Sequence, residues 1–303
     1  MSIIKANQTT TIPVTTTIPP TKSYKRFPLA DVIVAAVVLL GLAPLVWTFA
    51  ASPELDWQAV TEYLFNPLIL QGVAVTLMLS VVTMALGMVI GAVIAGFAIS
   101  GMVVLRWLAN AYVWVFRAIP LLVQLIFWFN LGLVIPMIGF FPGTSFGFGI
   151  STNDVISGIV AAILGLTLHE AAVIAEIYRG GMAGVSAGQR EAGLAVGLTP
   201  GVTNRRIIFP LAFRSVVPAL GNTFIGLLKA TALVSVIGAG DLLTNTQRIY
   251  AQNFQVIPLL IVATVWYMVI TAVFMIAQAA LERWLEARST YSIDYSRTTT
   301  VEV

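Results

Sequence analysis

The sequence has no cysteine and only one histidine among its 303 residues. The lack of cysteine excludes disulfide bonds, a thiolate nucleophile and a cysteine-based metal site. The motifs HExxH, GxSxG and GxxxxGKS/T are also missing, so the chain carries neither a familiar catalytic constellation nor the phosphate-binding loop of an ATPase. We therefore expect no enzymatic activity of its own, no cofactor and no bound metal.

Charged side chains are also scarce. They make up 10% of the chain, whereas hydrophobic residues make up 58%, and an ordinary soluble domain has roughly 25% charged residues. This composition indicates an integral membrane protein that resides in a lipid bilayer. The net charge of +3 is too small to suggest binding to nucleic acid, so we interpret the basic residues as topology signals.

The first 27 residues are rich in threonine and proline and poor in residues that pack a core. Such a composition cannot offset the entropy of ordering, which predicts a disordered tail over residues 1–27. The tail is not a signal peptide, because the first apolar run comes late and no small-residue cleavage site follows it.

Six apolar segments are long enough to cross a hydrocarbon core of about 30 Å, which takes roughly 20 helical residues. They are residues 31–51, 67–99, 108–136, 155–180, 216–240 and 257–282. Continuous apolar runs lack the alternation of strands in a membrane barrel, so we expect an all-α polytopic protein.

The loops between these spans differ strongly in charge. Almost all basic residues outside the spans, from Lys5 to Arg297, fall on one side, and only Arg248 falls on the other. Basic loops face the cytosol. Both termini and the loop between the fourth and fifth spans are therefore predicted to be cytosolic.

That loop, residues 186–210, has the signals of two short helices. Ser186 to Gln189 form a capping box, in which the serine hydroxyl caps the third helical N–H and the glutamine reaches back. Gly197 suits a left-handed helix end, and Thr199 with Pro200 reads as the N-cap and first residue of a second helix. Pro210 is expected to kink or end that helix. These features fit a docking surface and equally a plain surface hairpin.

A family resemblance favours the docking surface. Glu191, Ala192 and Gly193, then Gly197, then Ile207 and Pro210 resemble the EAA loop of ABC importer permeases. Glycine at 193 and phenylalanine at 209 depart from that motif. The stretches FRAIPLLVQL, AEIYRGGM, SAGQREA and LGNTFIGLLKATALVSVIGAGDLL are similar to the polar amino acid subfamily, and the similarity covers about residues 68–285.

The resemblance implies a type I ABC importer permease fold, a five-helix core preceded here by one extra N-terminal span. It divides the chain into the tail 1–27, an extra helix and external segment at 28–66, the permease domain at 67–285 and a C-terminal tail at 286–303. The implied role is the import of a polar amino acid. The implied location is a bacterial plasma membrane, which the chain crosses several times.

The implied partners are a cytosolic ATPase dimer, a second permease subunit, identical or homologous, and an extracytoplasmic substrate-binding protein. In the family the EAA loop fits a cleft of the ATPase. Small side chains at Ala192, Gly193 and Ala195 are expected to let the partner approach closely. The residues implied in this coupling are Gln189, Arg190, Glu191, Ala192, Gly193, Gly197, Ile207 and Pro210.

Polar side chains inside the spans are expensive, so they indicate a substrate pathway. The candidates are Gln124, His169, Glu170, Lys229, Thr231 and Ser235. Glu170 departs from the Asn-Tyr-Ala-Ala pattern of the family, and it could bind a cationic group or form an ion pair with Lys229 that only orients helices. His169 could instead form a hydrogen bond between helices.

Two other charged residues in the spans have simpler interpretations. Glu176 is expected to pair with Arg179 on one helix face, and Arg117 to extend its side chain toward the cytosolic interface. The aromatic segment Ile138–Asp154, which has no charge before Asp154, is predicted to be an external loop, which could touch a binding protein or cover the pore.

Two other classes of protein stay open. A secondary transporter would also place polar groups at mid-depth, but it normally has paired internal repeats, and the halves of this chain show no convincing match. A channel-like subunit would need no docking loop.

Overall fold

The computed structural model describes residues 28–52, 55–140 and 148–287. The predicted tail at 1–27 and most of the tail at 286–303 lie outside these residues. Five described helices are long and apolar enough to cross a membrane, and a bent helix pair forms a sixth candidate span. The predicted all-α architecture with six spans is confirmed.

The chain divides into two units between Leu55 and Asp56. The first unit contains α1 (Pro28–Ala50), which corresponds to the predicted span 31–51. Its apolar side chains are exposed along the helix, as lipid contact requires. Pro44 lies inside α1, and the hydroxyl of Thr48 donates a hydrogen bond to the Pro44 carbonyl oxygen at 2.8 Å.

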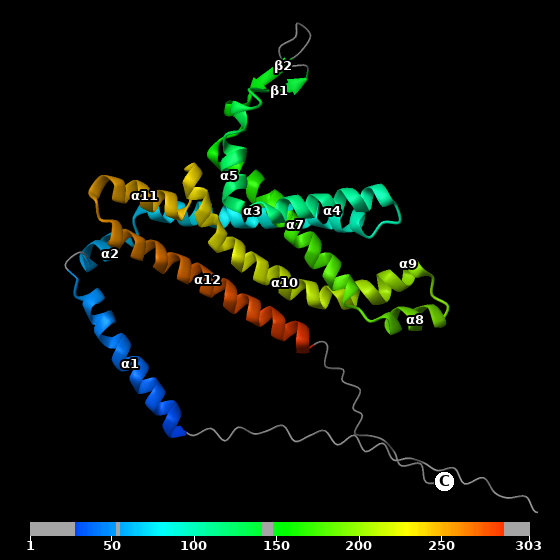
Figure 1. Cartoon of the computed structure of the whole chain (residues 1–303), viewed down its shortest axis with the longest axis horizontal. Helices are drawn as coiled ribbons and strands as arrows, with labels where there is room; N and C mark the ends of the chain where they lie inside the picture. Colours follow the sequence, from blue (N-terminus) through cyan, green and yellow to red (C-terminus); the bar gives the residue numbers. More distant parts are fainter. Residues whose placement is uncertain (1–27, 53–54, 141–147, 288–303) are drawn as a thin grey trace, which may run out of the picture. The chain divides into compact units, whose positions relative to one another are not determined.

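Two long helices, α3 (Pro67–Ala98) and α7 (Gly158–Ala183), pack together at the centre of the second unit (Figure 1). Gly87 and Gly91 of α3 allow their close approach. A Cβ atom at Gly91 would lie 3.0 Å from the carbonyl oxygen of Ala171 in α7. Small residues four apart let membrane helices approach closely, and this GxxxG pair lies in the α3–α7 contact.

The fifth and sixth spans lie side by side (Figure 1). The fifth begins as α10 (Phe209–Ala230) and continues as a 3₁₀ helix (Thr231–Ile237). Gly238, with φ of +66°, ends it in the left-handed conformation that glycine adopts without strain. The sixth is α12 (Val256–Ala287). The predicted spans 216–240 and 257–282 thus correspond to helices in the structure, and the helix of the fifth span begins earlier than predicted.

The third span is broken, which corrects the expectation of one continuous helix over 108–136. It consists of α4 (Val103–Ala118) and α5 (Leu121–Phe129), which meet at 97°. Pro120 has no N–H to continue the helical ladder, and a proline drives the residue before it out of the helical region. Ile119 accordingly has φ −86° and ψ 127°.

Two short helices lie between the spans and have aspartate N-caps. Asp56 accepts hydrogen bonds from backbone N–H groups at the start of α2 (Trp57–Tyr63), and buried Asp241 does the same for α11 (Leu242–Asn253). An N-cap carboxylate satisfies donors that the helix itself leaves unpaired.

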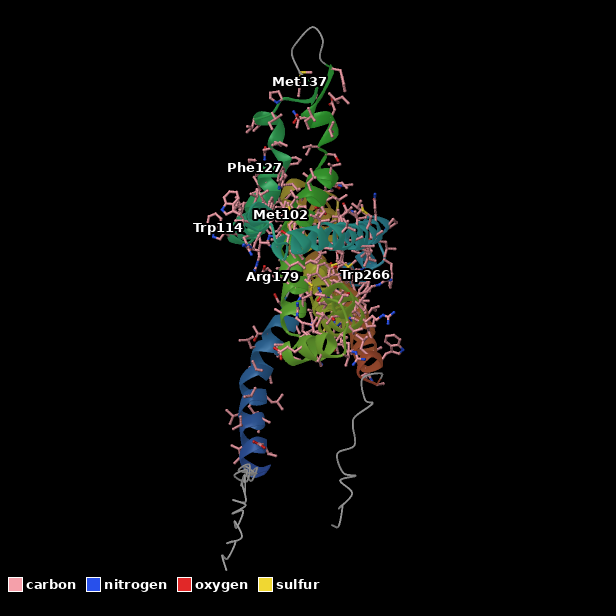
Figure 2. All side chains as sticks on the ribbon, turned by 90° about the vertical axis from the view of Figure 1, so that its right-hand side faces the viewer. Met102, Trp114, Phe127, Met137, Arg179 and Trp266 are labelled. Carbon is pink, nitrogen blue, oxygen red and sulfur yellow. The ribbon has the colours of Figure 1, made fainter. Side chains whose placement is uncertain are left out.

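The predicted external loop Ile138–Asp154 falls partly outside the described residues. Its described part forms an antiparallel hairpin, β1 (Met137–Phe140) and β2 (Phe148–Ser151), followed by α6 (Thr152–Val155). The hairpin projects beyond α5 from the main body of helices, as the position of Met137 relative to Phe127 shows (Figure 2). This short sheet was not expected from the sequence.

Candidate functional site

The 186–210 loop folds as two short helices, α8 (Ala187–Ala195) and α9 (Pro200–Thr203). Gly197, with φ of +82°, ends α8 in the predicted left-handed conformation. The N–H of Leu198 donates to the Gly193 carbonyl at 3.2 Å and that of Gly197 to the Leu194 carbonyl at 3.0 Å. This pair of bonds is a Schellman motif, which satisfies carbonyls at the helix end and makes the turn rigid.

The start of α8 differs in one detail from the capping-box prediction. Ser186 is the N-cap residue with extended backbone, but its side chain makes no capping hydrogen bond. Thr199 and Pro200 begin α9 as predicted, again without a side-chain cap. The sequence therefore predicted both helix starts and overestimated the side-chain hydrogen bonds at them.

Gly193 is buried inside the loop. A Cβ atom there would lie 2.8 Å from Cγ2 of Thr203 and 2.9 Å from Cδ1 of Ile207. Gly193 thus allows a close approach within the chain, where α8 packs on α9 and on the turn that follows it. Gly193 serves the shape of the loop because any larger side chain would separate the two helices.

The outward surface of α8 carries both charge and apolar area. Gln189, Arg190, Glu191 and Ala192 are exposed. Leu194 and Val196 are also exposed, Val196 by 76%. Apolar side chains flanking an arginine and a glutamate are typical of a surface that a partner protein covers.

The chain from Pro200 to Ile237 stays helical past Pro210. Asn204–Ile208 form a π-helical turn, in which the N–H of Phe209 donates to the Asn204 carbonyl. Pro210 was expected to kink or end the helix. Instead, the widened turn before it accommodates a residue that has no N–H and whose ring would crowd the preceding turn.

Gln124 and His169 meet at the break between α4 and α5. The Gln124 Nε2 atom donates to the carbonyl oxygens of Phe116, at 2.9 Å, and Ile119, at 2.8 Å. His169 Nδ1 lies 3.0 Å from the Phe116 oxygen and 3.3 Å from Gln124 Nε2. The two side chains thus occupy the place of the backbone donor that Pro120 lacks. The interhelical hydrogen bond considered for His169 is present.

Glu170 lies in the seam between α7 and α3. It is 7% exposed, and a Cβ atom at Gly87 would lie 3.5 Å from its Cβ. Its Oε2 atom has no hydrogen-bond partner among the described residues. Neither of the two ion pairs in the described chain joins Glu170 to Lys229. The helix-orienting pair considered from the sequence is therefore not formed within this chain.

Lys229, Thr231 and Ser235 lie where α10 passes into the 3₁₀ helix. Lys229 is exposed, and Ser235 is half-buried. Thr231 is fully buried, with its hydroxyl donating to the Leu228 carbonyl at 2.7 Å. Of the three, Lys229 and Ser235 present polar atoms to the surroundings of the chain.

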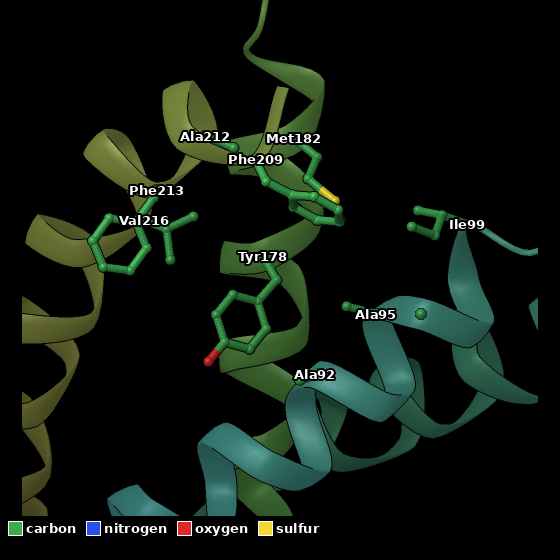
Figure 3. Close-up of a pocket in the computed structure, with 10 residues that line it drawn as sticks. Ala92, Ala95, Ile99, Tyr178, Met182, Phe209, Ala212, Phe213 and Val216 are labelled. Carbon is green, nitrogen blue, oxygen red and sulfur yellow. The ribbon is translucent and has the colours of Figure 1, made fainter. Parts of the chain in front are cut away.

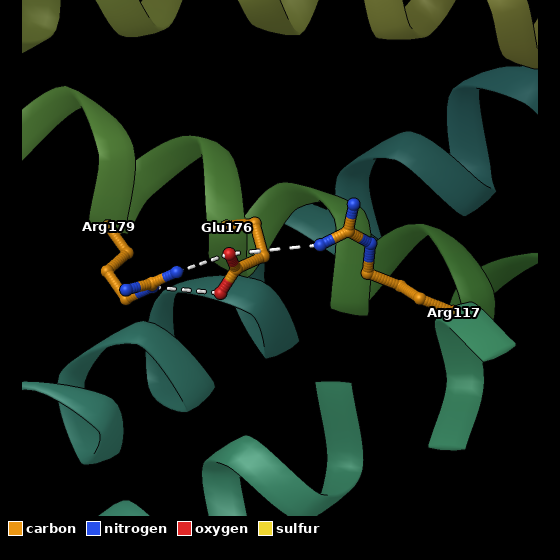
Figure 4. Close-up of polar contacts among 3 residues, drawn as sticks. All are labelled: Arg117, Glu176 and Arg179. Carbon is orange, nitrogen blue, oxygen red and sulfur yellow. Dashed lines mark hydrogen bonds and ion pairs between the residues drawn. The ribbon is translucent and has the colours of Figure 1, made fainter. Parts of the chain in front are cut away.

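Glu176 is shared by two arginines (Figure 4). Arg179, on the same helix, donates to both of its carboxylate oxygens, at 2.9 Å and 2.5 Å, so the predicted Glu176–Arg179 pair is confirmed. Arg117, at the end of α4, lies 3.8 Å from Oε2. Its side chain was expected to extend toward the interface, and it joins α4 to α7 instead.

The second unit also has an open apolar pocket of about 330 Å³ (Figure 3). It is lined by α3, α7 and α10, with Tyr178, Met182, Phe209 and Phe213 among its residues, and no charged side chain lines it. A zwitterionic solute would lose its hydration there without compensation. The pocket separates the start of α10 from the end of α3.

Residues 87–287 match the protein family described as binding-protein-dependent transport system inner membrane component. The chain belongs to this family. The permease is 35% identical over 264 residues to the arginine transport system permease protein ArgU of Corynebacterium glutamicum, covering 86% of this chain and 82% of the relative. It is 35% identical over 237 residues to the glutamine transport system permease protein GlnP of Escherichia coli, covering 76% and 97%.

Solved structures agree. The crystal structure of an amino acid ABC transporter with histidines superposes on the permease with a TM-score of 0.67 and 30% identity, covering 76% of this chain and 98% of the other. An inward-facing MetNI methionine ABC transporter gives a TM-score of 0.57 and 25% identity, with coverage of 72% and 96%. The predicted membership in the ABC importer permeases for polar amino acids is confirmed.

Proposed function

We propose that this permease moves a polar amino acid into the cell and that a cytosolic ATPase drives it through the 186–210 loop. The observation that carries the proposal is the rigid pair α8–α9, which joins spans α7 and α10 and exposes Arg190, Glu191, Leu194 and Val196. The names of the relatives, which include permeases for arginine and glutamine, support an amino acid as the substrate.

Coupling follows from the way the loop is built. Gln189, Arg190, Glu191 and Ala192 form the contact surface, while Gly193, Gly197, Ile207 and Pro210 hold its shape. When a partner protein binds α8 and shifts it, the loop moves as a rigid unit, because the Schellman turn and the Gly193 contacts resist deformation. The motion reaches α7 and α10 directly, and rigid-body displacement of these spans switches access to the pathway.

The ATPase is a separate subunit, since this chain has no phosphate-binding loop. A second permease subunit covers the polar groups left exposed within the spans, and an extracytoplasmic binding protein delivers the amino acid. The complex resides in a bacterial plasma membrane with both termini of this chain and the 186–210 loop in the cytosol, as the basic loops favour.

The substrate pathway is proposed to pass the break at Pro120 and the end of α10. Lys229 and Ser235 face it, and Thr231 supports them from the buried side. Gln124 and His169 stabilise the break beside this pathway through their hydrogen bonds. Glu170 borders it from the α3–α7 seam, with one buried oxygen that has no partner among the described residues.

The test is uptake by proteoliposomes that contain the permease complex and its binding protein, with a panel of labelled amino acids that includes arginine and glutamine. ATP-dependent uptake of one of them is expected. Replacing exposed Leu194 with Asp is expected to abolish uptake and substrate-stimulated ATP hydrolysis while the permease still inserts. Gly188→Ala is the control, because a Cβ atom at Gly188 contacts nothing. Uptake that continues without ATP would contradict the proposal and favour a secondary transporter.

A further inference from the structure

Arg117, Glu176 and Arg179 form a cluster with one carboxylate and two guanidinium groups. Arg179 holds both oxygens of Glu176. Arg117 is attracted to the same carboxylate from 3.8 Å but makes no hydrogen bond to any residue that the structure describes. The cluster therefore keeps an excess positive charge, and the N–H donors of Arg117 are free.

The cluster lies at membrane depth. Arg117 is in the last turn of α4, about 20 Å from the first residue of that helix at 1.5 Å per residue. The neighbouring Phe116 carbonyl contacts His169, near the middle of α7. Glu176 is about 10 Å from the end of α7 at Ala183. The cluster thus lies between the middle of α7 and the end of α7 that leads into the 186–210 loop.

The three side chains are nevertheless open to their surroundings. Arg117 is 52% exposed, Arg179 51% and Glu176 26%. Charged groups within a membrane span do not face hydrocarbon; they face a water-filled pathway or another subunit. The side of the chain that carries the cluster is therefore turned toward the interior of the complex.

We propose that Arg117, with Arg179 beside it, is a binding site on the pathway for the α-carboxylate of the transported amino acid. This proposal rests on the proposed function. A guanidinium presents N–H donors in a planar fork that matches both oxygens of a carboxylate. Arg117 has that fork unoccupied, whereas Arg179 has its own engaged by Glu176.

Glu176 makes the site reversible. It competes with the incoming carboxylate for the same two guanidinium groups, so the solute binds more weakly than it would to two free arginines. Sites along a conducting path must bind tightly enough to admit a solute and weakly enough to release it. Return of Glu176 to Arg117 displaces the solute carboxylate toward the cytosolic end of α7.

The test is equilibrium binding to the purified complex of permease and ATPase without its binding protein. The probes are L-arginine and L-glutamine, each paired with the amine that lacks its carboxylate. Arg117→Gln is expected to raise the Kd of the amino acid about 10-fold or more, the loss typical of a charge-assisted hydrogen bond, and to leave the Kd of the amine unchanged. The Kd of the amino acid for Arg117→Lys is expected to lie between those of the wild type and Arg117→Gln. The matched control is Arg106→Gln, an exposed arginine on the same helix.

Glu176→Gln is expected to change the Kd in the opposite direction, because it removes the carboxylate that competes for Arg117. The Kd of the amino acid should fall several-fold, and its uptake should slow. A cluster that only joins α4 to α7 would weaken binding in both variants, and that result overturns the proposal. The proposal is also overturned if the Arg117→Gln complex loses the second permease subunit, because Arg117 would then bind a carboxylate side chain of that subunit. Lack of any ATP-driven uptake by the wild-type complex would instead overturn the proposed function itself.

Discussion

The Nδ1 atom of His169 lies 3.0 Å from the carbonyl oxygen of Phe116. This contact connects the middle of α7 to the point where the third span breaks. The Gln124 side chain donates to the same oxygen, so a single backbone carbonyl is bonded by side chains from two elements. Gln124 and His169, both expected along a substrate pathway, thus form one structural joint with this carbonyl.

Gln124→Leu is expected to destabilise the permease more than any other change at this joint. It removes the side-chain donor of the Ile119 carbonyl and one of the two side-chain partners of the Phe116 carbonyl, and each lost hydrogen bond costs about 0.5–1.5 kcal/mol. The check is the thermal unfolding midpoint in a fixed lipid or detergent. Asn130→Ala is the control, since Asn130 makes an equivalent but exposed bond to Ile126 at the other end of α5. Equal midpoints for the two variants would show that the break is stable without Gln124.

Gly91→Ala is expected to lower stability by about 1–3 kcal/mol, the range for overpacking a tight contact. Its methyl group would meet the Ala171 carbonyl oxygen, a backbone atom, at 3.0 Å. Gly96→Ala on the same helix meets nothing within 4 Å and is expected to be neutral or to stabilise by up to about 1 kcal/mol through helix propensity. Denaturation curves of both variants measure the difference, and a tolerated Gly91→Ala would mean that α3 and α7 can separate freely.

Gly197→Ala is expected to loosen the 186–210 loop. A β-carbon at φ +82° costs roughly 1–2 kcal/mol, whereas asparagine tolerates this conformation better. Hydrogen exchange of the α8 amides should therefore rise in Gly197→Ala, rise less in Gly197→Asn and stay unchanged in Gly188→Ala. Unchanged exchange in all three variants would show that the Schellman turn does not limit the motion of the loop.

Asp241 predicts a pH dependence of stability. Burial raises the pKa of this carboxyl above its ordinary value of 3.8, although hydrogen bonds from Thr244 and Leu243 oppose the shift. Because the folded pKa is raised, folding favours the protonated form. The stabilisation is complete below the ordinary pKa and is lost as the pH rises through the folded pKa. The unfolding midpoint should therefore fall with pH over that window.

The variant Asp241→Asn keeps a capping oxygen and has no charge to titrate, so its midpoint should change less over the same window. Asp56→Asn, at the exposed cap of α2, is the matched control for losing a capping charge. A wild-type midpoint that rises with pH, with Asp241→Asn flat, would contradict the predicted direction.

Glu170→Gln is expected to maintain or raise the unfolding midpoint. The carboxylate is buried with one oxygen unpartnered, and a buried unpaired charge is unfavourable. Since Glu170 and Lys229 form no ion pair in this chain, Lys229→Met should not alter the effect. A strong loss of stability from Glu170→Gln that Lys229→Met restores would show that the two residues pair in the assembled complex.

Much of this fold could be predicted because local signals and hydrophobic runs coincide. The bounds of α1, α3 and α12 follow the apolar runs closely, and Gly197 was identified from helix-end chemistry alone. The broken span was not predicted. Pro120 lies inside the predicted span 108–136, and hydropathy does not distinguish a straight span from one that turns by 97°.

The contacts within the candidate site were harder to predict. The motif gave the position of Gly193 but not its neighbours, because spacing does not tell which side of a helix meets another part of the same chain. The Arg117–Glu176 pair joins residues far apart in sequence, and only the packing of α4 on α7 brings them together. Pro120, three residues after Arg117, was the available signal for a change of direction there.

The break at Pro120 also affects how the third span can move. Its halves are linked by the peptide chain and by side-chain hydrogen bonds to Phe116 and Ile119, without a continuous helical ladder. The bending stiffness of the span therefore depends on a glutamine and on a histidine that belongs to another helix. Any displacement of α7 along its axis must change the angle between α4 and α5 or break the bond to His169, so the two motions share one degree of freedom.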